Sequence, residues 1–309
     1  MTTLPMPDAP ASPANGELAQ VGGTMGAPRV QLDDLSVSVV IYRPDVDVLT
    51  RTFECLGAAA RAFVAARRGR TVSLSVVDNG DAPGGDGVSS GLAPAFAALR
   101  AHGVPYRVIG GHGNVGYGRG HNLALEGVGS ACHLVLNPDI DMEPEALVEA
   151  VGFLERHPEV GLLTPWVGDA DGRTQYLCRR FPAVLDLLVR GFLPASLRSA
   201  FASRLARYEM REAINVRDVV WEPPIVSGCF MLFRTTVLKQ LGGFDPRYFL
   251  YFEDYDLSLR THALAQVAYV PAVCVVHHGG GASRKGFAHI RMFGVSLVKF
   301  YNRFGWKLV

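Results

Sequence analysis

The sequence predicts an α/β fold with a mostly parallel central sheet flanked by helices. Three short, β-branched apolar runs, over residues 37–42, 72–77 and 133–136, have the composition of buried strands. Stretches with apolar residues at helical spacing lie between them, and each run ends in a turn-forming sequence. Strands that alternate with helices in this way form βαβ units, so we expect a largely parallel sheet.

The expected elements follow the chain in a regular order. The first half should hold a strand over 37–42, a helix over 46–68, a strand over 72–77, a loop and helix, a strand over 106–109, a glycine-rich stretch over 110–120, a helix from about His121 and a strand over 133–136. From about residue 160 the composition changes. There we expect mainly helix over 181–217, a strand near 225–233, a helix over 254–264, a strand over 267–276, a glycine-rich turn and an amphipathic helix from about Phe287.

Residues 1–34 are rich in Ala, Pro and Gly without a hydrophobic period, which predicts a disordered leader. One domain is expected over 35–285, with its two halves meeting near residue 160. The closing helix occupies 286–309. It could pack on the same domain, on a second subunit in a homodimer, or on lipid.

Composition narrows the class of protein. Of 309 residues, 49% are hydrophobic and 19% are charged, which is typical of a globular chain with a substantial core. The 30 basic and 29 acidic side chains leave a net charge of +1, which argues against a nucleic-acid partner. Five scattered cysteines without C-x-x-C spacing fit a reducing compartment. The chain shows neither a signal peptide nor an apolar run of about 18 residues, so we expect any membrane contact to be peripheral.

Polar clusters follow three of the expected strands. They are Tyr42-Arg43-Pro44-Asp45, Asp78-Asn79-Gly80 and Asn137-Pro138-Asp139-Ile140-Asp141. Each alone reads as a strand-terminating turn, but parallel strands present their carboxyl ends at one ligand-binding edge. In the third cluster, two carboxylates flank one residue and suit Mg²⁺ or Mn²⁺. Asp139 is the better candidate ligand, because Asp141 also fits the start of the helix that follows.

A glycine-dense stretch over 110–120 is expected either to cradle phosphates or to form a plain flexible loop. Its spacing, with Gly113, Gly116, Gly118 and Gly120, differs from the G-x-G-x-x-G of dinucleotide-binding proteins. It also follows the third strand rather than the first. A Rossmann dehydrogenase is therefore disfavoured.

Three further segments carry candidate chemistry. In 249–257 three acids lie among aromatics, which raises carboxylate pKa and favours a general base, although acids also commonly occupy the first turn of a helix; both can hold, with Asp254 chemical and Asp256 structural. In 277–285, His277 could bind a metal, and Arg284 or Lys285 a phosphate, although such residues are often plain surface groups. Residues 179–217 carry eight Arg against three acids, a net +5, which suits either anionic lipid or a solvated helical face.

These motifs, in this order, resemble the family 2 glycosyltransferases with a GT-A fold, and within them the rhamnosyltransferases that extend lipid-linked precursors of O-antigen and related polysaccharides. The similarity covers about residues 36–300. It rests on the segments VSVVIYRPD, VVDNG, GNVGYGRGHNLAL, LVLNPDIDM, RRFP, VSGCFMLFR, GGFDPRYFLYFEDYDLSLR and HHGGGAS.

The resemblance implies roles for particular residues. Asp254 would be the catalytic base, with Glu253 beside it, and 35–160 and 161–285 would be the nucleotide-binding and acceptor halves. The donor contacts would be Tyr42, Arg43, Asp78, Asn79, Asn114, Gly116, Arg119, Asn122 and Asn137. The metal ligands would be Asp139, His277 and Asp141, and the phosphate or acceptor contacts Arg179, Arg180, Arg284 and Lys285. Asn137 stands where the first Asp of the metal-binding D-x-D motif is often found, and Tyr42-Arg43-Pro44 replaces the common Thr-Tyr-Asn.

The implied activity is inverting transfer of L-rhamnose from dTDP-L-rhamnose to a polyprenyl-diphosphate-linked saccharide, with Mg²⁺ or Mn²⁺, on the inner face of the bacterial cytoplasmic membrane. One alternative is a galactofuranosyl- or other hexosyltransferase of the same family that uses a UDP-sugar. A catalytically inactive glycan-binding scaffold is another. A nucleotidyltransferase is disfavoured, because the first strand is followed by YRPDVDVL, without glycine or lysine.

Overall fold

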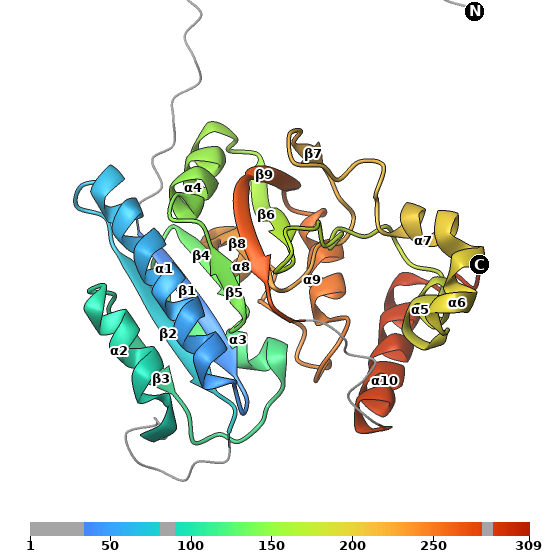
Figure 1. Cartoon of the computed structure of the whole chain (residues 1–309), viewed down its shortest axis with the longest axis horizontal. Helices are drawn as coiled ribbons and strands as arrows, with labels where there is room; N and C mark the ends of the chain where they lie inside the picture. The colour runs from blue at the N-terminus through green and yellow to red at the C-terminus, as the bar shows by residue number, and fades with distance from the viewer. Residues whose placement is uncertain (1–33, 81–89, 280–286) are drawn as a thin grey trace, which may run out of the picture.

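A computed structural model describes residues 34–80, 90–279 and 287–309 (Figure 1). Its strands are β1 (Leu35–Ile41), β2 (Val72–Asp78), β3 (Tyr106–Ile109), β4 (Cys132–Leu136), β5 (Ile140–Met142), β6 (Val160–Gly168), β7 (Val220–Trp221), β8 (Phe230–Arg234) and β9 (Gln266–His277). Its α-helices are α1 (Val46–Ala66), α2 (Ala93–Ala101), α3 (Tyr117–Leu125), α4 (Ala146–Arg156), α5 (Val184–Phe192), α6 (Ala195–Arg198), α7 (Ala202–Tyr208), α8 (Thr235–Gln240), α9 (Glu253–Thr261) and α10 (Phe287–Phe304). The predicted α/β class with a mostly parallel sheet is confirmed.

All the strands form one sheet in the order β3-β2-β1-β4-β8-β6-β9-β5, and β7 pairs with β9. The neighbours β3, β2, β1 and β4 are parallel, and β6 is parallel to β9. β8 runs antiparallel between β4 and β6, while β5 and β7 run antiparallel to β9. The sheet therefore passes through both halves of the chain without a break.

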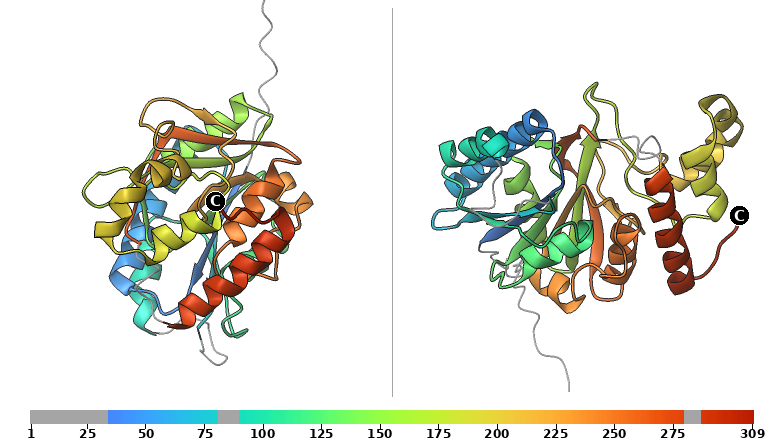
Figure 2. Two further views of the ribbon diagram at one scale, coloured as in Figure 1. Left: turned by 90° about the vertical axis from the view of Figure 1, so that its right-hand side faces the viewer. Right: turned by 90° about the horizontal axis from the view of Figure 1, so that it is seen from below.

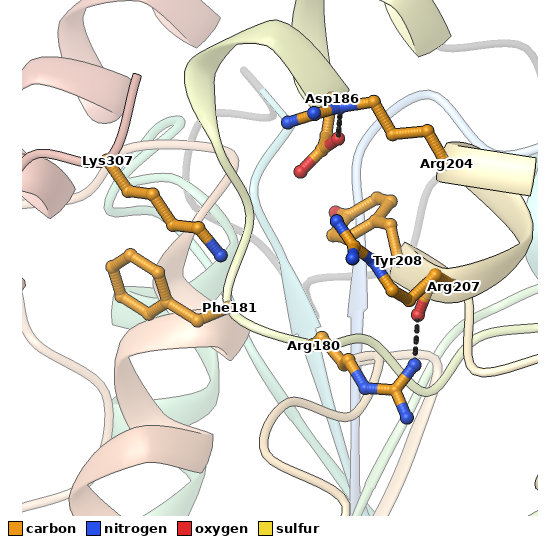
Figure 3. Close-up of a pocket in the computed structure, with 7 residues that line it drawn as sticks. All are labelled: Arg180, Phe181, Asp186, Arg204, Arg207, Tyr208 and Lys307. Atoms are coloured by element: carbon orange, nitrogen blue, oxygen red, sulfur yellow. Dashed lines mark hydrogen bonds and ion pairs between the residues drawn. The ribbon is translucent and has the colours of Figure 1, made fainter. Parts of the chain in front are cut away.

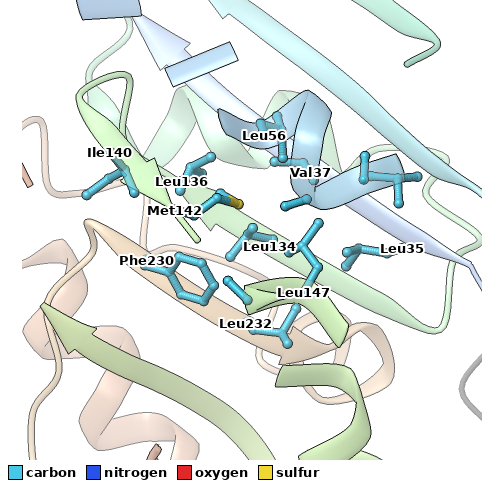
Figure 4. Packing of buried hydrophobic residues seen from close by; sticks show 14 of the residues in the cluster. Leu35, Val37, Leu56, Leu134, Leu136, Ile140, Met142, Leu147, Phe230 and Leu232 are labelled. Carbon is cyan, nitrogen blue, oxygen red and sulfur yellow. The ribbon is translucent and has the colours of Figure 1, made fainter. Parts of the chain in front are cut away.

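Alternation along β1 divides its side chains between two faces of the sheet. Val37, Val39 and Ile41 join the main core with the buried stripe of α1, which includes Phe53 and Leu56. Figure 4 shows this core between α1, α4 and the strands. Apolar residues at helical spacing therefore fix α1 against this face.

The opposite face of β1 carries a buried polar chain. Ser38 Oγ lies 2.7 Å from His121 Nδ1 and 2.9 Å from His133 Nε2, and Ser36 Oγ lies 2.7 Å from His133 Nδ1. Buried polar groups are stabilising when they find partners of this kind. Both histidines are about 1% exposed, so the chain belongs to the interior of the fold.

Helices cover both faces of the sheet. α1, α2 and α4 lie on one face, and α3, α8 and α9 lie on the other, as the views in Figure 2 show. Buried residues from α8, α9 and the strands, such as Leu238, Leu257 and Met231, form a second core cluster there. The sheet is thus buried on both sides, as expected of parallel strands.

A separate layer of helices, α5 to α7 and α10, lies beyond α9 (Figures 1 and 2). Phe300 and Tyr301 of α10 are fully buried in a third cluster with Tyr248 and Phe252. The closing helix therefore packs on the same chain, one of the three arrangements open from the sequence. Among the described helices, none is both long and apolar enough to cross a bilayer.

Most expected elements are present with ends shifted by a few residues, but β5, β6 and β7 were not predicted. β5 has only three residues and lies inside the segment interpreted as a metal-binding turn. The expected helical region 181–217 is broken into α5, α6 and α7. Residues 1–33 of the expected leader lie outside the described residues.

Candidate active site

The carboxyl ends of β1, β2 and β4 meet at one edge of the sheet, as predicted. In the parallel ladder Ile41 lies opposite Asp78, and Val39 lies opposite Leu136. The Asn79 N–H donates to the Ile41 carbonyl over 2.9 Å, which holds the turns after β1 and β2 together. The three polar clusters therefore share the edge at which such sheets bind ligands.

The turn from β4 to β5 carries Asp139 to a histidine that is remote in sequence. Because β5 pairs with β9, Ile140 lies opposite His277, and His277 Nε2 is 3.4 Å from Asp139 Oδ1. Gln175 holds the histidine from another side, since its Nε2 donates to the His277 carbonyl (2.8 Å) and its Oε1 lies 3.1 Å from Nδ1. A Cβ at Gly279 would lie 2.6 Å from His277 Nε2 and closer still to Asp139 Oδ2. Glycine at this position avoids a collision with the pair.

The Asp139–His277 pair fits a divalent cation. Asp139 Oδ1 is buried without a hydrogen-bond partner among the described residues, and carboxylate oxygens are ligands that Mg²⁺ and Mn²⁺ prefer. Burial alone would raise the pKa of Asp139, but the interaction with the His277 ring 3.4 Å away and a contribution from Asn137 outweigh it and lower the pKa. The carboxylate is therefore ionised, as a metal ligand has to be.

Asp141, the third predicted ligand, lies apart from this pair. Its Oδ2 is 2.6 Å from Arg51 Nε and 2.6 Å from His278 Nε2. Across residues 34–80, 90–279 and 287–309, no three His, Cys, Asp or Glu side chains gather in a metal-binding group. The structure thus brings together two of the three predicted ligands.

Glu253 and Asp254 open α9 after a strained turn. Tyr251 and Phe252 have φ angles of 72° and 66°, left-handed values that cost non-glycine residues about 1–3 kcal/mol each. The turn directs Asp254 towards the segment before β8, where the Gly228 N–H donates to its Oδ2 over 3.0 Å. Such strain persists only where surrounding packing holds it, and it is concentrated at functional sites.

The residues before β8 connect the Asp254 carboxylate to the Asp139–His277 pair. Gly228 binds Asp254, and the carbonyl of the next residue, Cys229, accepts a hydrogen bond from the Asn137 N–H over 2.9 Å. Asn137 begins the turn that carries Asp139. Two candidate centres from opposite halves of the chain are therefore joined through two adjacent backbone groups.

Tyr117 lies between the two centres. Its hydroxyl donates to the Gly228 carbonyl over 2.7 Å. Burial raises its pKa well above the usual value, and the nearby charges of Glu253, Asp254 and Asp139 raise it further. The Tyr117 hydroxyl therefore stays neutral and feels the charge of carboxylates from both centres.

Burial also raises the pKa of both carboxyls at the start of α9. For Glu253, repulsion from Asp254 adds to the effect of burial. For Asp254, hydrogen bonds from the Gly228 and Tyr255 N–H groups and the charge of Arg179 partly offset burial. A carboxylate with a raised pKa is a stronger proton acceptor, which suits Asp254 to general-base chemistry.

Three of the glycines of 110–120 serve close packing. A Cβ would collide with another part of the chain at three of them: Gly116 against Phe249, Gly118 against Phe244 and Gly120 against Val40. Gly116 also has a φ of 92°, which favours glycine. Residues 116–120 are therefore a packed start of α3 on β1 and on the segment before α9, whereas a Cβ at Gly111 or Gly113 would meet nothing within 4 Å.

Most other side chains predicted to contact the donor are hydrogen-bonded within the protein. These bonds join Asn79 and Asn114 to Gly116, Asp78 to Gly80, Arg119 to Pro246 and Asn122 to Phe244. They shape the edge of the site, and their contact with a donor stays a prediction. Tyr42, by contrast, is 46% exposed, with the Arg43 guanidinium 5.2 Å from its ring centre.

The predicted phosphate or acceptor contacts separate into three groups. Arg284 and Lys285 lie outside the described residues. Arg179 is only 4% exposed, and its guanidinium lies 5.6 Å from the ring centre of Tyr208. Arg180 forms an ion pair with Glu212 at 2.6 Å. Of these residues, Arg179 is the one whose charge acts on Asp254, where it lowers the pKa.

Sequence reasoning missed Tyr117, Gln175 and Gly279. Gly279 follows His277 and His278 directly, so its position beside a predicted metal ligand could have marked it as part of the site. Tyr117 lies within the glycine-rich stretch, whose packing is visible only in three dimensions. Gln175 reaches His277 across 102 residues and carries no local signal.

Comparison with known proteins shows the family of the chain and its relatives. A family model described as "Glycosyltransferase like family 2" matches residues 33–291. The N-acetylglucosaminyl-diphospho-decaprenol L-rhamnosyltransferase of Mycobacterium tuberculosis (strain ATCC 25618 / H37Rv) is 31% identical over 265 residues, 80% of this chain and 76% of the relative. Rhamnosyltransferase WbbL of Escherichia coli (strain K12) is 29% identical over 186 residues, 57% of this chain and 66% of the relative.

Among solved structures, GalNAc-T7 with UDP, GalNAc and Mn²⁺ is similar in fold, with a TM-score of 0.54 at 14% identity over 80% of this chain and 43% of that chain. The fold is thus GT-A, and the class of protein is a glycosyltransferase. The chain belongs to the glycosyltransferase-like family 2, and its curated relatives above are rhamnosyltransferases.

Proposed function

We propose that this protein transfers L-rhamnose from dTDP-L-rhamnose to a polyprenyl-diphosphate-linked saccharide, with inversion at the anomeric carbon. The observation that carries the proposal is the link between Asp254 and the Asp139–His277 pair through Gly228 and Cys229. A proton acceptor and a cation site held this close suit attack by a hydroxyl on a sugar whose leaving group is a diphosphate. The names of the relatives support the sugar and the lipid-linked acceptor.

In the proposed reaction, Asp254 accepts the proton of an acceptor hydroxyl as its oxygen attacks the anomeric carbon. The new carbon–oxygen bond forms on one face of the sugar while the bond to the nucleoside diphosphate breaks on the other. Mg²⁺ or Mn²⁺ held by Asp139 and His277 would neutralise charge on the departing diphosphate. Buried Arg179 supplies a further positive charge on the acceptor side.

We place the protein peripherally on the inner face of the bacterial cytoplasmic membrane. The helical layer carries exposed apolar side chains, among them Phe192 (49% exposed), Leu197 (58%) and Trp306 (52%). Arginines of 179–217 lie on the same layer. Apolar side chains among basic ones are what a peripheral protein needs to bind anionic lipid.

The base assignment is tested with Asp254→Asn. General-base assistance contributes about 10²–10⁴ in rate, so turnover should fall by that factor while donor affinity stays close to wild type. Asp256→Asn is the matched control, because Asp256 is on the same helix but bonds Arg260 and Arg303. It should lower thermal stability and keep the turnover of the folded fraction. Wild-type turnover by Asp254→Asn would refute the assignment.

The donor is tested by thermal shift with nucleotide sugars and nucleoside diphosphates, with and without Mg²⁺ or Mn²⁺. A ligand that binds the folded state raises stability by RT ln(1 + [L]/Kd). Metal-enhanced stabilisation by dTDP-rhamnose is the expected result. Stabilisation by UDP-sugars alone would mean that the donor is a UDP-sugar, with the proposed mechanism unchanged. No response to any nucleotide would favour a glycan-binding scaffold.

A further inference from the structure

A pocket of about 270 Å³ lies in the helical layer, between α5, α7 and the tail that follows α10 (Figure 3). Its walls include four basic side chains and one carboxylate: Arg180, Arg204, Arg207, Lys307 and Asp186. Nothing in the proposed mechanism uses this pocket.

The positive charge in the pocket is only partly neutralised. Asp186 pairs with Arg204 at 2.5 Å and also accepts from the Ala183 N–H over 2.8 Å. Among the described residues, the ion pairs of the pocket's basic side chains are Arg204 with Asp186 and Arg180 with Glu212, and none involves Arg207 or Lys307. Figure 3 shows these two side chains reaching into the pocket from opposite sides. Two uncompensated cations facing one space attract an anion.

Hydrogen bonds hold the backbone segments that carry Lys307 and Arg207. The Val184 and Leu185 N–H groups at the start of α5 donate to the Lys307 and Leu308 carbonyls, over 2.8 and 3.2 Å. These bonds hold the tail against α5, with Lys307 at the pocket. The Arg180 guanidinium donates to the Arg207 carbonyl over 2.6 Å. Groups held in place before binding lose less entropy when a ligand arrives.

One pair of tyrosines separates the pocket from the candidate base. Tyr208 lines the pocket, and its hydroxyl lies 2.6 Å from the hydroxyl of Tyr255, the residue after Asp254. The pocket is therefore connected to the start of α9, where the candidate base lies. Trp306, which is 52% exposed, is the neighbour of Lys307 in the chain and offers an apolar surface beside the charges.

We infer that this pocket binds the diphosphate of the lipid-linked acceptor, so that the sugar reaches Asp254 while the prenyl chain leaves along the exposed apolar side chains. The inference rests on the proposed function. Guanidinium groups match phosphoryl oxygens in geometry, and an ammonium group adds a point charge. The pocket would thus set the distance between the diphosphate and the hydroxyl that reacts.

The test compares wild type with the double variant Arg207→Ala/Lys307→Ala. Binding of inorganic pyrophosphate and of farnesyl diphosphate is measured by calorimetry without divalent metal. Loss of two charge-assisted bonds should weaken both ligands by about tenfold or more. The double variant Arg61→Ala/Arg68→Ala removes the same charge from exposed positions on and just after α1, and should bind both as wild type does. Equal binding by wild type and the pocket variant would overturn the inference.

Two further measurements distinguish the acceptor diphosphate from a lipid headgroup, and failure of the pocket inference from failure of the proposed function. With a polyprenyl-diphosphate saccharide as acceptor, the pocket variant should raise KM for the acceptor and leave donor affinity unchanged. If it instead lowers only the binding of phosphatidylglycerol vesicles, the pocket holds a lipid headgroup and the inference fails. If no sugar is transferred by wild type but diphosphate binding still depends on the pocket, the pocket stands and the proposed function falls.

Discussion

Gly279 leaves room for the Asp139–His277 pair because it has no side chain. A Cβ there would be 2.6 Å from His277 Nε2, too close for any real contact, and the other atom in its way is a carboxylate oxygen of Asp139. Either the pair or the backbone has to move if a methyl group is added. The position is therefore sensitive in function, although it carries no functional group.

We predict that Gly279→Ala lowers activity strongly and raises the concentration of Mg²⁺ or Mn²⁺ needed for half-maximal rate. The reason is displacement of Asp139 or His277, not loss of the core, so the melting temperature should change little. Gly129→Ala is the control, since a Cβ there meets nothing within 4 Å. A Gly279→Ala enzyme with the metal dependence of wild type would contradict the role of the pair.

The sequence was sufficient to identify the important acidic residues, but not the side chains that contact them. Asp139 and Asp254 stood out because each follows or precedes a recognisable element and lies among other acids or aromatics. The orientation of Asp141 towards Arg51 could not be read from spacing, because the arginine is ninety positions away on another element. Contacts of this range decide which of two neighbouring carboxylates is available to a ligand.

The helix α10 is attached to α9 by a buried charge. Arg303 Nη1 lies 2.7 Å from Asp256 Oδ1, and the Asp256 side chain is 0% exposed, while Arg260 holds its other oxygen at 2.6 Å. Burial raises the pKa of Asp256, and the two arginines oppose that effect. Removing one partner from a buried carboxylate is costly because the charge stays behind.

We predict that Arg303→Ala lowers the free energy of unfolding by about 1–3 kcal/mol, measured by urea denaturation. Arg303→Lys keeps the charge and should recover part of the loss. Arg291→Ala, an exposed arginine of the same helix, is the control and should be neutral. If Arg303→Ala unfolds at the same urea concentration as wild type, the pair does not hold α10 in place.

Periodicity predicted where most elements lie, but not how they pair. The strand expected near 225–233 is β8, and it enters the sheet antiparallel between β4 and β6. Strand direction depends on the path of the chain between elements, which a local pattern does not contain. β5 escaped prediction because three residues are too few for an alternation to be seen.

For the molecule as a whole, the buried histidines that bond Ser36 and Ser38 of β1 make the free energy of unfolding depend on pH. Burial lowers the pKa of His133 to about 4, and burial also lowers the pKa of His121. Histidines held neutral in the folded state contribute stability above their unfolded pKa, near 6.5, and that stability is lost as the pH falls towards 4. Glu253 acts in the opposite direction, because burial raises its pKa and protonation relieves the cost.

We therefore predict that the unfolding free energies of wild type and of His133→Asn depend differently on pH. For wild type relative to His133→Asn, the advantage in unfolding free energy should shrink by about 3 kcal/mol between pH 7 and pH 4, because 2.5 pKa units correspond to about that energy. The comparison removes the contribution of Glu253, which both proteins share. Parallel curves across this range would show that His133 is not held neutral by the fold.

The pairing of β5 with β9 means that neither half of the polypeptide contains a complete cation site. Asp139 comes before the exposed turn at Asp171 and Gly172, and His277 comes after it. Cutting the chain at that turn would give two fragments, each with one ligand and an incomplete sheet. Such fragments should associate by restoring the pairings of β4 and β6 with β8 and of β5 and β6 with β9, and Mg²⁺ or Mn²⁺ should then tighten their reassembly. The cation would act as a clasp between two separately made pieces, a property that a site built from one loop could not have.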